Sequence, residues 1–455
     1  MGAPFPDDFL WGAATSAYQI EGSPLADGAG ESNWHRFTHT PGWIAGGDTG
    51  DVACDHYRRW RDDVALMRAL GLTAYRFSIA WSRVLPEGTG AVNRRGLDFY
   101  RRLVETLREG GIEPMATLYH WDHPAALDER GGWLNPDSPR WFADYARVCF
   151  DALDGEVRLW ATLNEPWVVC DGGYLHGTLA PGHRSLWEAP RVAHHLLLAH
   201  AEAVLAYRAG GKHRIGLVVN VEPKHPASDR PEDVAAAARD DAYLNRHFTD
   251  PVFLGRYPEE LPALYGKGWR EPPAADLERI RRPLDFLGLN YYTRSVVRHD
   301  PACWPTGAGK VRQPGSVYTA LDWEVYPRGL EESLAWLRAR YGPVPIYVTE
   351  NGAACADSPS APGGRIEDAP RAAYLRDHLL AVRRALAAGA DVHGYFAWSL
   401  LDNFEWSRGY GPRFGIVHVD RATQRRTPKA SAEFYREVIR TCGAALDASA
   451  ASSRA

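Results

Sequence analysis

Short apolar runs of strand length recur along the chain, and longer amphipathic stretches separate them. In the stretches 55–71, 94–111, 138–155, 191–210 and 369–390, apolar residues recur at spacings of three and four, which predicts helices. The apolar runs predict eight strands, at Gly12–Ser16, Ala74–Ile79, Pro114–Leu118, Leu159–Leu163, Ile215–Val219, Phe286–Leu289, Ile346–Thr349 and Gly394–Trp398. The chain therefore alternates between strand and helix.

This alternation predicts an α/β fold, a single (β/α)8 TIM barrel whose long βα loops form one mouth. No Pro/Ser-rich linker, compositional break or internal repeat divides the sequence. We therefore expect residues 1–442 to form one barrel domain that carries the active site. Residues 443–455 are small and polar, and we expect them to form a flexible C-terminal tail.

Two of the predicted strands end on a glutamate. Glu165 follows Leu159–Leu163 within "TLNEP", and Glu350 follows Ile346–Thr349 within "TENG". In a TIM barrel the functional groups come from the C-terminal ends of the strands. Although the two glutamates are far apart in sequence, closure of the barrel would point both carboxyl groups into the same mouth.

Paired carboxyl groups across a cleft are the apparatus of glycoside hydrolysis, in which one attacks the anomeric carbon and the other protonates the leaving oxygen. A lone glutamate at a strand end is more often an ion-pair partner or a neighbour of a helix N-cap. Here two occupy matched strand ends, in Asn/Gly/Pro-rich turns of a chain with 17 tryptophans. On the residues alone, the structural and the catalytic interpretations stay equally open.

Composition narrows the class of protein. With 45% hydrophobic and 24% charged residues, and no uninterrupted apolar run of about 18 residues, the chain is typical of a globular protein without a membrane partner. The formal charge is only −5 and basic residues are scattered, so we expect no nucleic-acid partner. The first residues lack a signal-peptide pattern, which predicts a cytoplasmic location. A neutral small-molecule substrate suits this balance.

Several further motifs accompany the two glutamates. In chain order they are "FLWGAATSAYQIEG", "YRFSIAWSRVLP", "LYHWDHP", "TLNEP", "GLNYYT", "EVYPRGL", "TENG" and "NFEWSRGYGPRFGIVHVD". Together, from about Phe5 to Ile439, they resemble the β-glucosidases of glycoside hydrolase family 1. The resemblance implies a retaining enzyme of carbohydrate metabolism and cellulose degradation that acts by double displacement. Its expected substrates are terminal non-reducing β-D-glucosyl residues of cellobiose, short cello-oligosaccharides and aryl or alkyl β-glucosides. β-Galactosidase, β-fucosidase and transglycosylation activities are further expectations.

The resemblance also implies roles for the residues of the catalytic centre. Glu350 would be the nucleophile and Glu165 the acid/base, with carboxyl groups about 5–5.5 Å apart. An anionic Glu350 would raise the pKa of Glu165, and esterification of Glu350 would remove that repulsion. Arg76, at the end of the second predicted strand, and Tyr292 would keep Glu350 ionised, and Asn290 would support them. The structural alternative is a core ion pair and a packed tyrosine.

A sugar pocket follows from the same resemblance. It assigns substrate binding to Gln19, His120, Trp121, Asn164, Trp398, Glu405, Trp406 and Phe414, with Trp167 and Trp323 at the aglycone entrance. Amide and carboxylate groups suit adjacent hydroxyls, and an indole covers the apolar C–H face of a sugar ring. Asn164 would bond the 2-hydroxyl, a contact that strengthens in the transition state.

Two alternative functions fit the same fold. A 6-phospho-β-glycosidase needs cationic and hydroxyl groups around the phosphate, whereas Glu405 and Trp406 stand at that position and a carboxylate would repel a phosphate dianion. A sugar-binding protein that has lost the chemistry would keep the pocket and release no nitrophenol from an aryl β-glucoside. Because both glutamates are present, we favour an enzyme.

Histidine clusters raise a third alternative, a metal enzyme. His194, His195 and His200 lie in an alanine- and leucine-rich helix without the H-E-x-x-H spacing, which favours structural histidines. The sugar pocket accounts for the cluster that contains His120 and His123. We therefore expect no catalytic metal and no cofactor, and the sequence does not decide between a monomer and a homo-oligomer.

Overall fold

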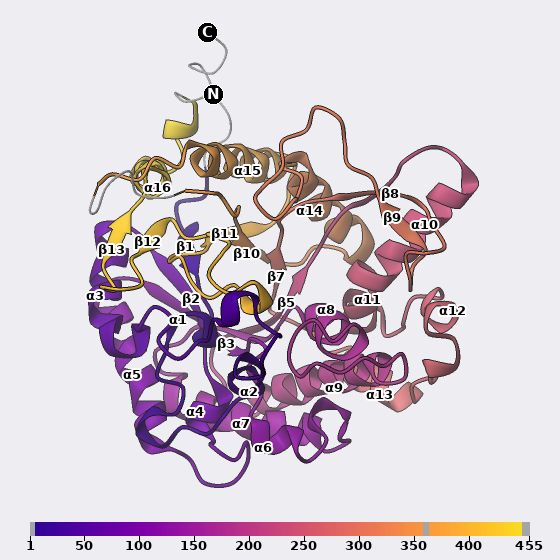
Figure 1. Ribbon diagram of the computed structural model, residues 1–455, viewed down its shortest axis with the longest axis horizontal. Helices are drawn as coiled ribbons and strands as arrows, with labels where there is room; N and C mark the ends of the chain where they lie inside the picture. The colour runs from indigo at the N-terminus through magenta and orange to yellow at the C-terminus, as the bar shows by residue number, and fades with distance from the viewer. Residues whose placement is uncertain (1–4, 358–363, 448–455) are drawn as a thin grey trace.

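The computed structural model, described here for residues 5–357 and 364–447, contains the predicted (β/α)8 barrel (Figure 1). Its strands are all parallel to their neighbours and close in the order β1-β11-β10-β7-β5-β4-β3-β2. Their bounds are β1 Leu10–Ala14, β2 Ala74–Ser78, β3 Glu113–Tyr119, β4 Leu159–Asn164, β5 Arg214–Asn220, β7 Phe286–Asn290, β10 Ile346–Asn351 and β11 Val392–Trp398. All eight predicted strands are confirmed.

The largest difference in strand bounds is at β1, which begins and ends two residues earlier than predicted. Leu10 and Trp11 pair with β11, because they lie opposite Gly394 and Tyr395. Thr15 and Ser16 instead lead into the first short helix. The apolar run located the strand to within two residues, and pairing with β11 fixes its register.

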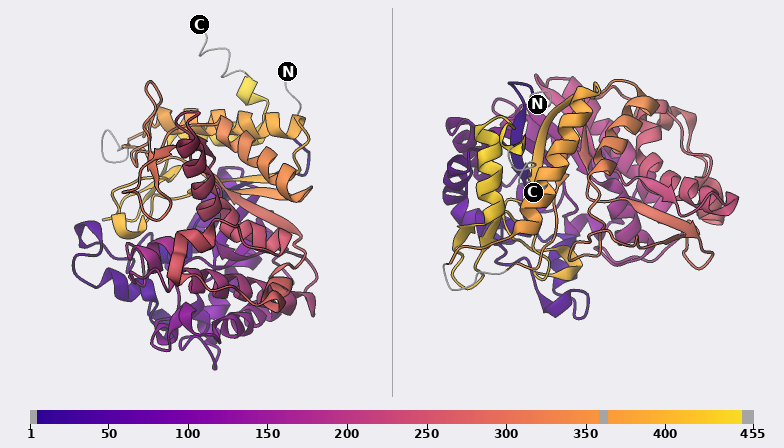
Figure 2. Two further views of the ribbon diagram at one scale, coloured as in Figure 1. Left: turned by 90° about the vertical axis from the view of Figure 1, so that its right-hand side faces the viewer. Right: turned by 90° about the horizontal axis from the view of Figure 1, so that it is seen from above.

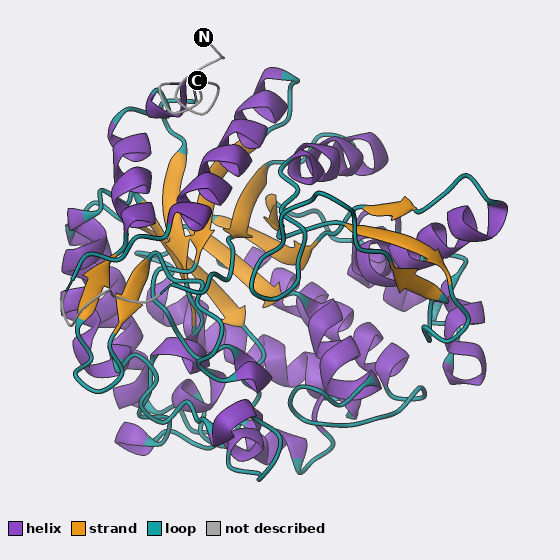
Figure 3. Cartoon of the chain, turned by 45° about the horizontal axis from the view of Figure 1, so that its top comes forward, coloured by secondary structure: helices purple, strands orange, loops and turns teal. Residues whose placement is uncertain are grey.

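Helices surround the barrel, as Figure 3 shows. They are α1 Ala17–Ile20, α2 Asn33–Thr38, α3 His56–Ala69, α4 Trp81–Val84, α5 Arg94–Glu109, α6 Ala125–Asp128, α7 Ser138–Leu153, α8 Pro166–Val168, α9 Ala189–Arg208, α10 Pro231–Asp241, α11 His247–Leu254, α12 Leu261–Tyr265, α13 Ala274–Ile280, α14 Arg328–Tyr341, α15 Ala369–Ala387 and α16 Ala430–Arg440. The five predicted helices correspond to α3, α5, α7, α9 and α15. None of the helices in the described ranges is long and apolar enough to cross a membrane.

Helix α5 illustrates why these segments become the outer layer. Leu97, Tyr100, Leu103, Val104 and Leu107 recur at spacings of three and four and are all buried, while the arginines between them are mostly exposed. Such a stripe buries one face against the sheet and leaves the other in water. Inside the barrel, large side chains such as Phe286 and Phe396 fill the space, so the barrel is a packed core.

Additional strands lie in the βα insertions, where the sequence predicted only loops. β6 Lys224–Pro226, β8 Ser295–His299 and β9 Ala308–Lys310 form a small sheet beside α10, at the right of Figure 1. β12 Val417–Val419 and β13 Arg426–Pro428 form a two-stranded sheet. Four of these strands have only three residues, which is too short to show a period of two. The fifth, β8, has five residues, but its sequence SVVRH does not alternate between apolar and polar side chains, so the sequence pattern did not indicate it either.

The C-terminal segment continues past the predicted domain boundary. Helix α16 packs against α15 (Figure 2), and the turn after it brings Leu446 to full burial. Gly443 donates its N–H to the carbonyl of Val438 at 2.8 Å and lies next to Phe5. Residues 443–447 therefore belong to the packed structure, and the rest of the predicted tail lies outside the described residues.

Candidate active site

The two strand-end glutamates meet at the C-terminal end of the barrel, as predicted. Glu165 directly follows β4, and Glu350 is the fifth residue of β10. Asn290, the last residue of β7, lies opposite Glu350 in the strand register and donates its side-chain N–H to Glu165 Oε1 at 2.7 Å. Both glutamates are buried, with 6% and 3% of their surface exposed. Closure of the barrel thus brings together carboxyl groups from distant parts of the sequence.

The backbone of Glu165 has an unusual conformation that the sequence did not reveal. Its φ of 44° and ψ of 63° place it in the left-handed region, which a non-glycine residue adopts only at a cost in free energy. The next residue, Pro166, disfavours a right-handed helical conformation for Glu165 and begins helix α8. The Asn-Glu-Pro sequence therefore ends the strand sharply at the acid.

Glu350 is held from β2 and from the segment that follows β7. Tyr292 donates its hydroxyl to Glu350 Oε2 at 2.6 Å, and Arg76 donates Nη1 to Oε1. Arg76 is fully buried and also donates Nη2 to Asn164 Oδ1 at 2.7 Å and Nε to Thr117 at 3.1 Å. The sequence placed Arg76 at the end of its strand, but it is the middle residue of β2. Its long side chain covers the remaining distance to the barrel mouth.

The next residues of the "TENG" motif lock this strand end in place. Asn351 donates its side-chain N–H to the carbonyl of Tyr291 at 2.6 Å and accepts a hydrogen bond from Tyr395 at 2.7 Å. A Cβ atom on Gly352 would lie 1.7 Å from the carbonyl oxygen of Trp398. Only glycine allows this close approach to the end of β11.

The surroundings of the two carboxyl groups differ in charge. Burial, followed by the negative charge of Glu350, raises the pKa of Glu165 to about 8. Burial also raises the pKa of Glu350, but the charge of Arg76 and the hydrogen bond from Tyr292 oppose that rise. The site therefore favours a proton on Glu165 and a negative charge on Glu350.

Most of the predicted sugar-binding residues form one connected group around His120. Asn164 donates its amide to His120 Nε2 at 3.1 Å, so the ring carries its proton on Nδ1. The ring stacks on Trp398 and Trp406 at centroid distances of 5.9 and 6.0 Å, and Trp121 lies 4.6 Å from Trp406. Burial and the nearby charge of Arg76 lower the pKa of His120 well below its usual value. A neutral imidazole therefore stands between the indoles.

Three predicted binding residues carry polar atoms that the protein leaves unpartnered. His120 Nδ1, Glu405 Oε2 and Trp167 Nε1 are buried, and none has a hydrogen-bond partner within residues 5–357 and 364–447. Buried polar groups of proteins almost always have partners. Two donors and a carboxyl oxygen of this kind suit a ligand that carries several hydroxyl groups.

Gln19, like Asn164, is a predicted binding residue whose amide already has protein partners. Its Nε2 donates to the carbonyl of Phe404 at 2.9 Å and to Asn403 at 3.2 Å, and its Oε1 accepts from Ser16 at 2.6 Å. These bonds join the N-terminal segment to the loop that carries Glu405. The structure thus gives Gln19 a role in holding this loop, beside the predicted contact with a sugar.

A cavity of about 400 Å³ opens beside Glu165, and Glu350 is not among the residues that line it. Glu165, Asn290, Tyr292, Trp167 and Trp323 line it, which brings both predicted entrance tryptophans to its wall. Phe414 lies behind this wall, 6.0 Å from Trp323 and 6.1 Å from Tyr292 between ring centroids. The lining does not include Gln19, Trp121, Glu405 or Trp406.

The far side of this cavity carries charges that the sequence analysis missed. Lys224 Nζ lies 2.6 Å from Glu222 and 2.9 Å from Asp240, and Lys310 lies 3.3 Å from Glu222. The four residues come from the sheet of β6, β8 and β9, from the segment before it and from α10, all within the βα insertions. The available signal was the sequence "VEPKH" directly after a predicted strand.

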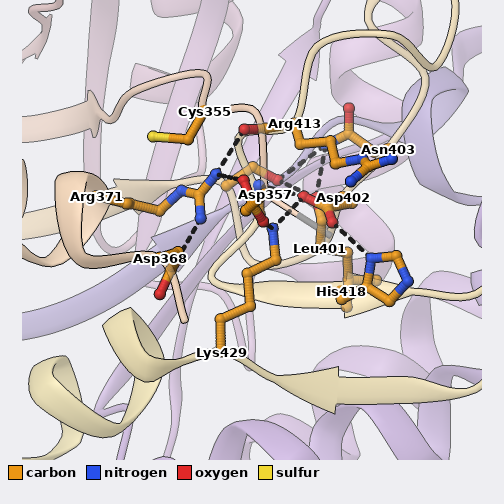
Figure 4. A network of polar contacts seen from close by, with 12 residues as sticks. Cys355, Asp357, Asp368, Arg371, Leu401, Asp402, Asn403, Arg413, His418 and Lys429 are labelled. Atoms are coloured by element: carbon orange, nitrogen blue, oxygen red, sulfur yellow. Dashed lines mark hydrogen bonds and ion pairs between the residues drawn. The ribbon is translucent and has the colours of Figure 1, made fainter. Parts of the chain in front are cut away.

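A buried ion network lies behind the loop that carries Glu405 (Figure 4). Lys429 is fully buried and contacts Asp357 at 2.5 Å and Asp402 at 2.8 Å. Asp402 also accepts from the backbone of Gly415 at 2.9 Å and contacts His418 at 3.1 Å. The network therefore fixes both ends of the loop between β11 and β12.

The histidines considered as metal ligands have other partners. His194 contacts Tyr257 at 3.1 Å and Asp276 at 3.2 Å, and His195 contacts the carbonyl of Trp133. His200 contacts the Thr162 hydroxyl at 2.7 Å. These contacts fit the structural interpretation of the three histidines. The expected absence of a catalytic metal stays a prediction.

Comparisons with known proteins agree with this fold and show the family of the chain. Residues 1–444 match the model of glycosyl hydrolase family 1. Beta-glucosidase A of Thermotoga maritima is 47% identical over 441 residues, which cover 96% of this chain and 98% of that protein. The beta-glucosidase of an Agrobacterium species is 43% identical over 443 residues, with coverages of 96% and 95%. The solved family 1 β-glucosidase from T. maritima superposes with a TM-score of 0.95 at 46% identity and covers 97% of this chain and 100% of that one.

The fold and the paired carboxyl groups define a glycoside hydrolase. The chain belongs to glycosyl hydrolase family 1. A similar structure, β-glucosidase from T. maritima in complex with glucoimidazole, has a TM-score of 0.94 at 47% identity.

The ion network predicts the effect of one substitution on stability. Lys429→Met leaves Asp357 and Asp402 without their shared cation, and breaking a buried ion pair costs about 3–5 kcal/mol. We expect the urea concentration at the unfolding midpoint to fall accordingly. Exposed Lys267 supplies the matched control, and Lys267→Met should change the free energy of unfolding by less than about 0.5 kcal/mol. Equal effects of the two substitutions would contradict the importance of the network.

Proposed function

We propose that the protein is a retaining β-glucosidase that removes terminal non-reducing β-D-glucosyl residues. The observation that carries this proposal is the asymmetry of the buried carboxyl pair. Glu350 contacts a guanidinium and a phenol, whereas the side-chain partner of Glu165 is the neutral amide of Asn290. A nucleophile must be ionised and a general acid protonated, which matches these surroundings.

In the first step the Glu350 carboxylate attacks the anomeric carbon and forms a glycosyl ester. The bond from that carbon to the leaving oxygen breaks, and the proton of Glu165 passes to this oxygen. Asn164 is held by Arg76 and His120 with its amide beside the carboxyl pair. We propose that it bonds the 2-hydroxyl, where transition-state charge strengthens the contact.

In the second step water hydrolyses the ester. Esterification removes the negative charge of Glu350 and with it one cause of the raised pKa of Glu165. Glu165 is then a carboxylate that takes a proton from the attacking water. Two displacements on opposite faces return the β-anomer, and this mechanism requires a carboxyl separation of about 5–5.5 Å.

The unpartnered polar atoms support a neutral sugar as the glycone. His120 Nδ1 is placed to donate to one hydroxyl and Glu405 to bond others, while Trp398 and Trp406 offer apolar ring faces. Burial and the charge of Glu350 raise the pKa of Glu405 to about 8, so this environment disfavours added negative charge. A 6-phosphorylated sugar would bring such charge, which makes a phospho-glycosidase the weaker candidate.

The cavity beside the carboxyl pair suits the aglycone. Its two indoles offer stacking faces, and its charged far side offers partners for sugar hydroxyls. Cellobiose, short cello-oligosaccharides and aryl or alkyl β-glucosides combine these features, and the relatives named above are beta-glucosidases. We further propose β-galactosidase or β-fucosidase side activity and transglycosylation, carried out by one catalytic domain in the cytoplasm.

The decisive experiment follows p-nitrophenyl β-glucoside by proton NMR and compares its rate with those of the β-galactoside and the 6-phosphorylated glucoside. We expect the unphosphorylated glucoside to react faster than the phosphorylated one and to release the β-anomer first. Glu350→Ala should lower kcat by at least about 10⁴-fold while circular dichroism shows an intact fold. Release of the α-anomer, preference for the phosphorylated sugar, or no turnover at all would each refute the proposal.

The role of Glu165 predicts a dependence on the leaving group. Glu165→Ala should lower kcat/KM for cellobiose by about 10²–10⁴-fold, because its alkoxide leaving group needs a proton. The value for 2,4-dinitrophenyl β-glucoside should change far less, since that phenolate leaves without one. Steady-state rates on both substrates provide the test, and equal losses would contradict the assignment of Glu165 as the acid.

The raised pKa of Glu165 predicts an alkaline limit of activity. The acid must be protonated, so kcat/KM for cellobiose should fall as the pH rises through about 8. Glu405 has a pKa in the same range, so the profile alone cannot assign the limit. The profile of Glu165→Ala on 2,4-dinitrophenyl β-glucoside separates the two, because it should lose the limit. A limit that persists in this variant would assign the titration to another group.

A further inference from the structure

Two histidines and an aspartate converge beside helix α2, away from the carboxyl pair. His35 lies in α2 and His39 directly follows it, so the spacing of four residues places both on one helix face. Asp51 comes from the following loop. One ligand atom from each of the three side chains lies within 4.8 Å of the others. This cluster is distinct from the two groups of histidines that the sequence suggested as metal ligands.

The spacing of these atoms suits a small metal ion. His39 Nε2 lies 3.1 Å from Asp51 Oδ2, and His35 Nδ1 lies 3.6 Å from Asp51 Oδ1. A tetrahedral zinc ion binds nitrogen and oxygen at about 2.0–2.2 Å, which places neighbouring ligand atoms about 3.4 Å apart. The two observed separations lie on either side of this value.

The hydrogen bonds of His39 orient its other nitrogen toward the aspartate. His39 Nδ1 lies 2.7 Å from the carbonyl oxygen of His35, and because a carbonyl only accepts, Nδ1 carries a proton. In the neutral ring the lone pair of Nε2 then faces the carboxylate of Asp51. Two acceptors that face each other repel, whereas a metal ion between them would bind both. A metal-binding histidine usually donates its other ring N–H to an acceptor such as a carbonyl, as His39 Nδ1 does here.

A simple histidine–aspartate ion pair explains only part of the cluster. A protonated His39 would account for its 3.1 Å contact with Asp51. His35 Nδ1 and Asp51 Oδ1, however, are buried without a hydrogen-bond partner in the described parts of the chain, and 3.6 Å is too long for a bond between them. On the opposite side of the His35 ring, Nε2 lies 3.7 Å from Glu31, which is also too long for a hydrogen bond.

We propose that His35, His39 and Asp51 bind one divalent transition-metal ion, with Zn²⁺ as the best match. Two imidazoles and one carboxylate are ligands typical of Zn²⁺, whereas Ca²⁺ and Mg²⁺ select oxygen ligands alone. The side chains of His39 and Asp51 are 42% and 43% exposed, which leaves the ion a path from solvent. Water would complete the coordination.

The position of the cluster indicates a stabilising role. The ion would join α2 to the loop of Asp51, whose neighbours Asp48 and Thr49 accept hydrogen bonds from Tyr410 at 3.0 and 2.8 Å. Trp34 of α2 packs 4.4 Å from Trp406 between ring centroids. Metal binding would therefore stabilise the segments that pack against the Glu405 loop. The ion would take no part in the reaction, so this proposal does not depend on the proposed β-glucosidase activity.

Metal titration of the full chain, freed of metal with a chelator, tests the site. We expect calorimetry to give one Zn²⁺ per chain and Co²⁺ to produce the visible absorption of a low-coordinate site. Zn²⁺ at about 100 times its dissociation constant should raise Tm by roughly 3 °C. His39→Gln and Asp51→Asn should each weaken binding by at least about 10-fold.

The matched control is His393, which is 33% exposed and pairs with a single aspartate, Asp391, at 2.9 Å. His393→Gln should bind Zn²⁺ as the wild type does. Absence of saturable binding, or equal affinity in the His39→Gln and wild-type proteins, would overturn the proposal. If His39→Gln lowers Tm in the absence of metal, the substitution also destabilises the fold. The Zn²⁺ affinity of Asp51→Asn and the Co²⁺ spectrum of the wild type then show whether the metal site exists.

Discussion

The buried contact between Arg76 and Glu350 is the constraint on which the site depends. The two residues are 274 positions apart in sequence and lie on β2 and β10, so only the closed barrel brings them together. A buried charge without its partner costs several kcal/mol, so the contact is stable only while this geometry is kept. The same guanidinium also holds Asn164, next to Glu165. One cation thereby fixes the relative positions of both strand-end carboxyl groups.

The asymmetry of the site follows from this single cation. Arg76 and Tyr292 donate hydrogen bonds to Glu350, whereas Glu165 accepts its side-chain hydrogen bond from the neutral amide of Asn290. The charge of Arg76 also opposes the rise in the pKa of Glu165, but burial and the charge of Glu350 outweigh it. The raised pKa of Glu165 therefore follows from its burial and from the negative charge of Glu350, because the cation of the site makes its direct contact with Glu350. In the proposed mechanism the difference between nucleophile and acid/base thus arises from neighbours, because the two side chains are chemically identical.

The sequence predicted the barrel and its two strand-end glutamates from local signals, whereas the other residues of the site came from the family resemblance. Each strand is a short apolar run, and Glu165 and Glu350 stand in motifs at strand ends, where the fold requires functional groups. The left-handed backbone of Glu165 and the network of Lys429 leave no such signal, because they depend on contacts formed only in the folded chain. Gln19 shows the same limit: its motif placed it at the site, but its bonds to a loop 384 positions away are visible only in three dimensions.

Different parts of the structure hold the two halves of the proposed binding site in place. The residues around His120 lie at strand ends and in the loop after β11, which buried ions and Gln19 anchor. The charged far side of the cavity instead belongs to the βα insertions, on a separate sheet that contributes nothing to barrel closure. A change in the insertions therefore alters the shape of the aglycone side without disturbing Arg76 or the carboxyl pair. Under the proposed function, this separation would allow one barrel to keep its chemistry and its glycone while its preference for aglycones changes.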